Sequence, residues 1–164
     1  MSTVKEITQK KWITGSGLGI DFYKILQIIK SHILQGSKIF IGTDSFVSNG
    51  KVCFATALCL HGPGRPGRYF FYKDKQSSNP FRALIIRITE EVNRSLELAQ
   101  LLIQEYKINS SFIELHLDVS PRSVNEATSN FSDMLRGYVR GFGLNYRLKP
   151  NAWASQSIAD RHSK

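Results

Sequence analysis

Three consecutive segments of the chain have the composition of β-strands and are joined by strong turn signals. The segments are Lys38 to Phe46, Lys51 to Leu60 and Arg68 to Lys73. An Asn-Gly pair at residues 49–50 separates the first two, and Gly-Pro-Gly-Arg-Pro-Gly at residues 62–67 separates the second from the third. Asn-Gly favours a tight hairpin, and the second sequence excludes a helix or a central strand. We therefore expect an antiparallel meander of three strands.

Helical and strand-like segments alternate after this meander. Apolar spacing predicts a helix from Phe81 to Tyr106, a strand from Ser111 to Val119, a helix from Val124 to Arg140, a strand from Leu144 to Leu148 and a terminal helix from Ala152 to Lys164. A helix between two strands is a crossover, which makes those strands parallel. The chain is therefore expected to form an α/β fold with a mixed five-stranded sheet in the order β-β-β-α-β-α-β-α.

The length of the chain limits it to one main domain. A chain of 164 residues buries one sizeable core and is too short for two. Helical spacing from Asp21 to Gln35, ended by Gly36, adds a helix before the first strand. We expect residues 1–36 to form an N-terminal arm and helix packed on a domain of residues 37–164.

The charge is strongly basic but unevenly distributed. The chain has 22 Lys and Arg against 13 Asp and Glu, a net charge of +9. Residues 61–87 carry six positive charges and one negative, whereas residues 88–132 carry three and seven. A basic surface around an acidic centre suits a site that cleaves a polyanion, because lysine and arginine hold phosphates while carboxylates hold metal ions. Basic proteins without this function are also common.

The sequence gives no reason to expect export or membrane insertion. No segment approaches the roughly 18 apolar residues that a membrane helix needs, and the first seven residues lack the apolar part of a secretion signal. Cys53 and Cys59 would lie about 20 Å apart on one strand, too far to form a disulfide. We expect a cytoplasmic protein with two buried free thiols.

Two aspartates stand at the ends of predicted strands. Asp44 follows the apolar run that begins at Lys38, and Asp118 closes the run from Phe112. A buried carboxylate without a partner costs several kcal/mol, so such positions need a cation or a hydrogen bond. The alternatives are an Asx turn at Asp44 and a helix cap at Asp118.

Glu90 and Glu91 compete for a third place on the long helix. Glu91 lies about 110° from the centre of the apolar stripe on a helical wheel, and Glu90 about 150° from it. Glu91 is therefore at the margin between core and solvent, from which it could reach over the sheet, and we prefer it. The alternative is a surface glutamate paired with Arg87 or Arg94.

Several motifs in this order resemble the ribonuclease H-like superfamily, and within it a small YkuK-type family of bacterial proteins. They span residues 41 to 164 and comprise Ile41-Gly-Thr-Asp-Ser45, Thr89-Glu-Glu-Val92, Ser95-Leu-Glu-Leu-Ala99, His116-Leu-Asp-Val119, Gly141-Phe-Gly143, Lys149-Pro150 and Ala154-Ser-Gln-Ser-Ile-Ala-Asp-Arg-His-Ser-Lys164. Singly each motif is weak. Their order and spacing together are more specific.

The resemblance implies a nuclease that uses two Mg²⁺ or Mn²⁺ ions to cleave RNA, DNA or an RNA-DNA hybrid. The implied ligands are Asp44, which would bridge both ions, Glu91, Asp118 and Asp160, and His162 would assist proton transfer. Asp160 depends most on the resemblance, because a lone aspartate on a terminal helix is usually exposed.

The expected nucleic-acid-binding residues are Arg65, Arg68, Lys73, Lys75, Lys149 and Lys164. Aromatic residues alternate between Tyr69 and Tyr72, so one face of that strand could stack on bases. Two other functions remain open: a module that binds nucleic acid without cleaving it, and a protein-interaction module on the same fold.

Overall fold

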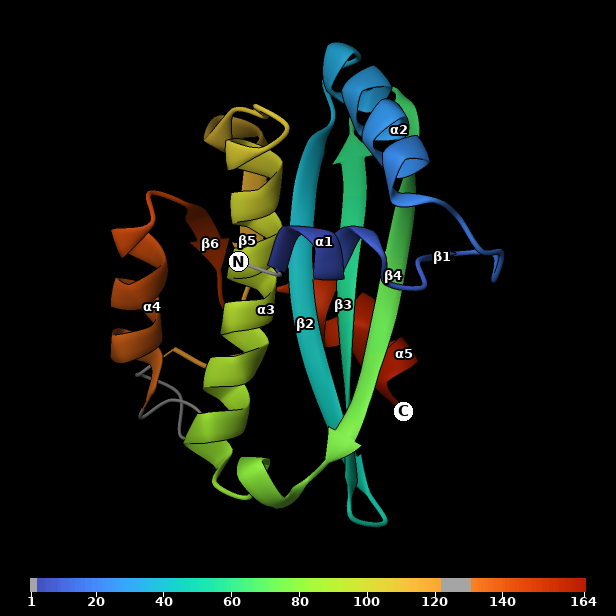
Figure 1. The fold of residues 1–164 in the computed structure, drawn as a ribbon. Helices are drawn as coiled ribbons and strands as arrows, with labels where there is room; N and C mark the ends of the chain where they lie inside the picture. Colours follow the sequence, from blue (N-terminus) through green and yellow to red (C-terminus); the bar gives the residue numbers. More distant parts are fainter. Residues whose placement is uncertain (1–2, 122–130) are drawn as a thin grey trace.

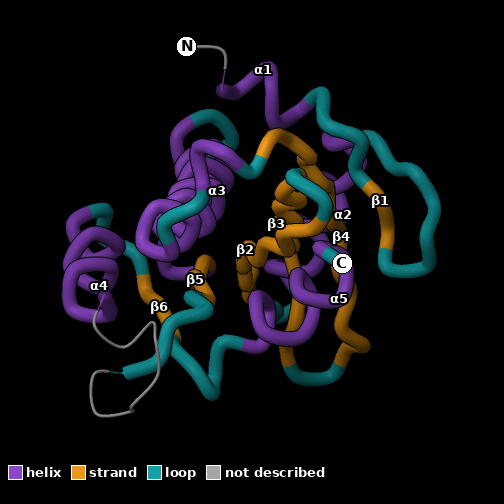
Figure 2. Tube along the Cα trace, turned by 90° about the horizontal axis from the view of Figure 1, so that it is seen from below, coloured by secondary structure: helices purple, strands orange, loops and turns teal. Residues whose placement is uncertain are grey.

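The fold is a single mixed sheet with helices on one face and the C-terminal segment on the other (Figures 1 and 2). The structure is a computed structural model that describes residues 3–121 and 131–164. Its elements are α1 (Thr3–Thr8), β1 (Ile13–Thr14), α2 (Phe22–Leu34), β2 (Lys38–Ser48), β3 (Lys51–Gly62), β4 (Arg65–Ser77), α3 (Leu84–Gln104), β5 (Ile113–His116), α4 (Ser132–Gly141), β6 (Asn145–Arg147), the π-helical turn η4 (Ala154–Ala159) and α5 (Asp160–Ser163).

The sheet has the strand order β1-β4-β3-β2-β5-β6. The strands β2, β3 and β4 form the expected antiparallel meander, while β5 is parallel to β2 and β6 is parallel to β5. The expected mixed α/β fold is thus confirmed. A sixth strand, β1, pairs with β4 at the edge of the sheet. It comprises only Ile13 and Thr14, too few residues to show an alternating pattern in the sequence.

Several element boundaries differ from those expected. The segment expected to be a loop at residues 62–67 is mostly strand: β3 ends at Gly62 and β4 begins at Arg65, with a turn at Gly64 whose φ is 75°. Pro66 is tolerated because no strand within residues 3–121 and 131–164 pairs with the outer edge of β4 there. The terminal helix begins as a π-helical turn. Of the helix expected from Val124 to Arg140, residues 124–130 lie outside the described part of the chain.

The two faces of β2 pack against different layers. Ile39 and Ile41 belong to the main core, which includes side chains of α2 and α3. Phe40 points to the opposite face and packs with Ala154 and Ala159 of the C-terminal segment in a smaller cluster. Period-two alternation thus divides the strand between the helical layer and the C-terminal segment. Among the described residues, none of the helices is both long enough and apolar enough to cross a membrane.

Gly42 lets the C-terminal segment lie directly on β2. A Cβ atom at this position would be 2.4 Å from the backbone nitrogen of Ser155 and 2.6 Å from the carbonyl carbon of Ala154. His116 of the adjacent strand fixes the same segment, because its Nδ1 accepts a hydrogen bond of 3.0 Å from the backbone N–H of Ala154. A glycine within a strand marks such a close approach of another backbone.

We predict that Gly42→Ala displaces the C-terminal segment and destabilises the protein by about 1–3 kcal/mol, because the added methyl group overpacks a site bounded by backbone. Urea unfolding measures this change. The matched control is Gly137→Ala in α4, where a Cβ would meet nothing within 4 Å. That change should stabilise the helix by about 0.5–1 kcal/mol. Equal stability of the two variants would contradict the prediction.

Candidate functional site

A narrow crevice opens where β2 and β5 separate. The two parallel strands are paired only as far as Gly42 and His116. Beyond that point β2 continues to Ser48, while the segment after β5 separates from β2 and remains hydrogen-bonded to Arg147 of β6 through the backbone N–H of Leu117. The crevice is lined by residues of β2, of α3 and of the segment that follows β5, namely Thr43, Ile88, Glu91, Val92, Ser95, His116, Leu117, Asp118 and Val119. It lies at the carboxyl ends of the two strands, where ligands commonly bind in open α/β sheets.

Asp44 lies just beyond the point where the strands separate, and it faces the C-terminal segment. It is only 7% exposed. Burial, a hydrogen bond with the Asp160 side chain and the charge of Asp118 raise the pKa of Asp44 to about 8, whereas the backbone N–H of Ser45 opposes this shift. The structure therefore brings three of the four expected acids within electrostatic reach of one another.

Glu91 reaches the same strand from the other face of the sheet. Its Oε2 accepts a hydrogen bond of 2.5 Å from the hydroxyl of Ser45. Burial raises the pKa of Glu91, and the charges of Asp44 and Asp118 raise it further. Glu90 instead points outward, where it pairs with Arg94 at 2.8 Å. The helical position that we preferred from the sequence is thus the buried one of the two.

Lysine side chains contact the two more exposed acids. Lys149 Nζ lies 3.2 Å from Asp118 Oδ1, and Lys164 Nζ lies 3.2 Å from Asp160 Oδ1. These two aspartate side chains are 22% and 38% exposed. The positive charges of the lysines offset the repulsion between neighbouring carboxylates at the solvent side of the site. The buried pair, Asp44 and Glu91, has no such ion pair among the described residues.

The donor set suits a hard divalent cation. All four side chains offer carboxylate oxygens, which Mg²⁺ and Mn²⁺ prefer. Burial and the neighbouring carboxylates raise the pKa of Asp44 and of Glu91, and a bound cation would favour the charged form of both groups. Across residues 3–121 and 131–164, however, no three His, Cys, Asp or Glu side chains are grouped closely enough to enclose an ion as they stand.

His162 lies apart from the four acids. Its ring stacks on Phe71 with centroids 3.7 Å apart, and its Nε2 is 3.0 Å from the hydroxyl of Tyr69. Burial lowers the pKa of His162, as do the charges of Arg161 and Lys73. No hydrogen bond or ion pair joins it to an acid among the described residues. The ring of His162 thus contacts Tyr69 and Phe71, and its role in proton transfer stays a prediction.

The expected nucleic-acid-binding residues fall into separate groups. Lys149 and Lys164 contact the acids, as described above. Lys73 and Lys75 lie in the second half of β4. Lys73 pairs with Ala55 of β3, and Ala55 in turn pairs with Asp44 of β2, so this half of β4 is level with Asp44. Arg65 is at the other end of β4, where its guanidinium donates to Gln35 of α2 at 2.6 Å, and Arg68 lies over the Phe70 ring. The structure thus does not bring Arg65 and Arg68 to the acids.

Two residues of the site were missed from the sequence. Ser45 contacts Glu91, and Phe46 lies on the same face of β2 as Asp44 with 41% of its surface exposed. The alternation of β2 already carried the signal for both residues, since Ser45 faces α3 and Phe46 faces the C-terminal segment.

With this geometry described, the chain can be placed among known proteins. It belongs to the ribonuclease H-like family, whose family model matches residues 22–164. The family membership expected from the motifs is thus confirmed. The chain is also similar to the "Uncharacterized protein YkuK" of Bacillus subtilis (strain 168), with 23% identity over 160 residues that cover 87% of this chain and 91% of the relative. That name states no activity. No solved structure gives a significant match.

The raised pKa of Asp44 predicts how stability depends on pH. Below the ordinary value of 3.8 the group is protonated in both the folded and the unfolded protein, so its contribution to stability is fully present. As pH rises towards about 8, the unfolded chain releases the proton while the folded protein retains it, and this contribution is lost. In EDTA, the free energy of unfolding of the native protein should therefore fall relative to that of Asp44→Asn, by up to about 1.4 kcal/mol per pH unit.

Urea unfolding between pH 5 and 8 measures this difference. The matched control is Asp133→Asn, an exposed aspartate of α4 whose side chain is 54% accessible. The free energy of unfolding of Asp133→Asn should change with pH in the same way as that of the native protein from pH 5 to 8. If Asp44→Asn also follows the native protein, the carboxyl of Asp44 is not held in the neutral form.

Proposed function

We propose that this protein is a metal-dependent phosphodiester hydrolase that cleaves nucleic acid. One observation carries the proposal: Asp160 and Asp118 both raise the pKa of the buried Asp44, and Asp44 and Asp118 raise that of the buried Glu91, so four acids from β2, α3, the segment after β5 and the C-terminal helix influence one another. Membership of the ribonuclease H-like family supports the same conclusion. The net charge of +9 favours a polyanionic substrate.

The residues that would hold metal ions are Asp44, Glu91, Asp118 and Asp160. Two Mg²⁺ or Mn²⁺ ions bound there would supply an activated water and would stabilise the negative charge of the leaving oxygen. Asp44 is held between two layers of the protein, with Asp160 on its own side of the sheet and Glu91 reaching Ser45 from the other. Ser45 keeps the Glu91 carboxylate turned towards the strand.

Lys149 and Lys164 have a second role in this proposal. Each lysine contacts an acid that would become a metal ligand, so each would be free to bind a phosphate oxygen once that acid turned to the metal. A lysine near the reacting phosphate offsets charge that develops in the transition state. The lysines thus act on the substrate, while the carboxylates act on the metal.

Loss of one carboxylate should abolish turnover. We expect Asp44→Asn to lower the rate of Mg²⁺-dependent or Mn²⁺-dependent cleavage more than about a hundredfold, because metal ions contribute several kcal/mol to such reactions. Labelled RNA, DNA and RNA-DNA hybrid strands would be tested side by side, with Asp133→Asn as the matched control. Cleavage that persists unchanged in Asp44→Asn would exclude the proposed site. Salt-sensitive binding without turnover would support the non-cleaving module instead.

Adjacent glutamates of α3 provide a second test. Glu91→Gln should weaken Mn²⁺ binding in calorimetry and lower cleavage, whereas Glu90→Gln should leave both unchanged, because the Glu90 carboxylate pairs with Arg94 instead of facing β2. At pH 8, Mn²⁺ should also raise the melting temperature of the native protein and of Glu90→Gln more than that of Glu91→Gln. Equal effects of the two substitutions would show that Glu91 does not serve as a ligand.

A further inference from the structure

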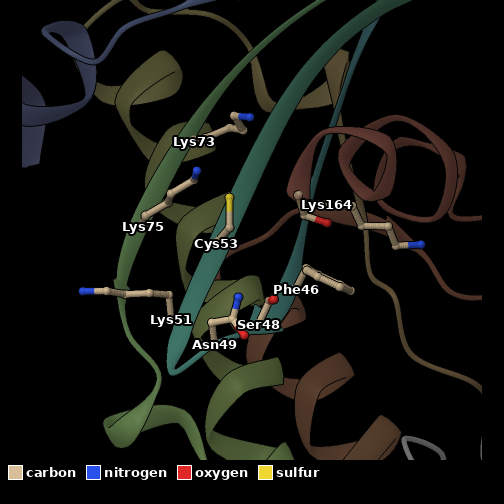
Figure 3. Close-up of a pocket in the computed structure, with 9 residues that line it drawn as sticks. Phe46, Ser48, Asn49, Lys51, Cys53, Lys73, Lys75 and Lys164 are labelled. Carbon is tan, nitrogen blue, oxygen red and sulfur yellow. The ribbon is translucent and has the colours of Figure 1, made fainter.

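A lysine-rimmed hollow lies beside the acids on the face of the sheet that carries the C-terminal helix (Figure 3). Its volume is about 360 Å³. The lining comes from β2, β3, the turn between them, β4 and residues 163–164, and it comprises Phe46, Ser48, Asn49, Lys51, Cys53, Lys73, Lys75, Ser163 and Lys164. Four of these residues are lysines and none is acidic, so the hollow is complementary to an anion.

Three of the four lysines have uncompensated charge. Lys51, Lys73 and Lys75 are exposed, and among the described residues none of them lies within ion-pair distance of a carboxylate. Lys164 contacts Asp160 and therefore joins the hollow to the acid site. Such an arrangement binds phosphates by charge rather than by a fixed hydrogen-bond pattern.

The hollow also has an aromatic wall. Phe46 is 41% exposed. It follows Asp44 by two residues in β2, so both side chains lie on the same face of the sheet. Two residues along a strand span about 7 Å, so a group stacked on this ring would be a near neighbour of the acids. The nearby thiol of Cys53 adds to the apolar surface between the lysines.

This combination of features fits one unpaired nucleotide. Base-aromatic stacking with lysines that follow the backbone is the usual way in which proteins hold single strands. The hollow is at the lower end of the roughly 300–1,000 Å³ range of small-ligand sites, which leaves room for one base and its sugar but not for a duplex. In a duplex, the faces of the bases are covered by their neighbours and cannot stack on Phe46.

We propose that this hollow binds a nucleotide of single-stranded nucleic acid and directs the strand to the acids, so that the substrate is a single strand rather than a duplex. The inference rests on the proposed nuclease function, since it names the strand that those carboxylates would cleave. Phe46 stacks on the base, and Lys51, Lys73 and Lys75 bind the flanking phosphates.

Fluorescence anisotropy of the full chain in EDTA tests binding without turnover. The probes are labelled oligo(U) and oligo(dT) strands and a duplex of mixed sequence and equal length. The native protein should prefer the single strands, and Phe46→Ala should weaken that binding about tenfold, in the range for losing one stacked base. Phe46→Trp should retain the binding, and Leu34→Ala, an exposed apolar residue of α2, serves as the matched control. A duplex bound as tightly as the single strands, or equal affinities of Phe46→Ala and Leu34→Ala, would overturn the proposal.

Salt dependence tests the lysines separately. The double variant Lys73→Gln with Lys75→Gln should reduce the slope of log affinity against log salt by about 1.4, because each lysine-phosphate contact on a single strand contributes about 0.7. The matched control is Lys24→Gln with Lys30→Gln, which removes the same charge from exposed positions of α2. Equal slopes for the two double variants would show general charge attraction and would also overturn the proposal.

Cleavage assays distinguish the two proposals. If single strands bind as expected but are never cleaved with Mg²⁺ or Mn²⁺, the proposed function fails while the binding site remains. If cleavage depends on Asp44 but Phe46→Ala changes neither KM nor kcat, the inference fails and the proposed function remains. Thermal unfolding of each variant shows whether a loss of binding reflects a loss of fold.

Discussion

The close contact between β2 and the C-terminal segment is the constraint on which the site depends. It exists because Gly42 has no side chain, so the backbone around Ser155 lies directly on the strand. The same contact is fixed from the next strand by His116, whose pKa burial lowers to about 4, with a smaller effect from the charge of Arg147. The ring is therefore neutral near pH 7 and keeps its Nδ1 as an acceptor. Together with the packing of Phe40 against Ala154 and Ala159, this contact holds Asp160 beside Asp44.

The candidate site also depends on the separation of β2 from β5. If the strands had remained paired beyond Gly42 and His116, backbone ladders would have filled the space that the acids now share. The expected strand from Ser111 to Val119 pairs with β2 only from Ile113 to His116. Asp118 is therefore on a segment that has separated from β2 while Leu117 still donates to Arg147 of β6, and its carboxylate contacts Lys149 and acts on Asp44. The shortened strand opens the crevice.

The sequence predicted the mixed sheet and the inward position of Glu91 better than it predicted the surroundings of the candidate acids. Alternation in β2 and the apolar stripe of α3 follow from burial, and both periods are visible without coordinates. The preference for Glu91 over Glu90 came from the same stripe. The strand β1 was missed because two residues show no period, and the loop expected near Gly64 proved to be a tight turn between long strands.

Contacts between segments that are far apart in the chain could not be predicted as well from the sequence. The stacking of His162 on Phe71 depends on how the C-terminal segment turns after its π-helical start, which an ideal helical wheel does not describe. The grouping of Arg65 with Lys73 assumed a short basic loop, whereas β4 is a long strand that carries the two residues to opposite ends. Each error arose where a local pattern was extended across an element of unexpected length or geometry.

Asp44 and Ser45 are adjacent on β2 and therefore point to opposite faces of the sheet, which determines which changes in loop length and strand register the site can tolerate. Asp160 approaches from one side of the sheet and Glu91 from the other. The thickness of β2 therefore sets the distance between Asp160 and Glu91. Connecting loops can change in length without altering this distance, whereas a one-residue slip in the register of β2 would exchange the partners of Asp160 and Glu91.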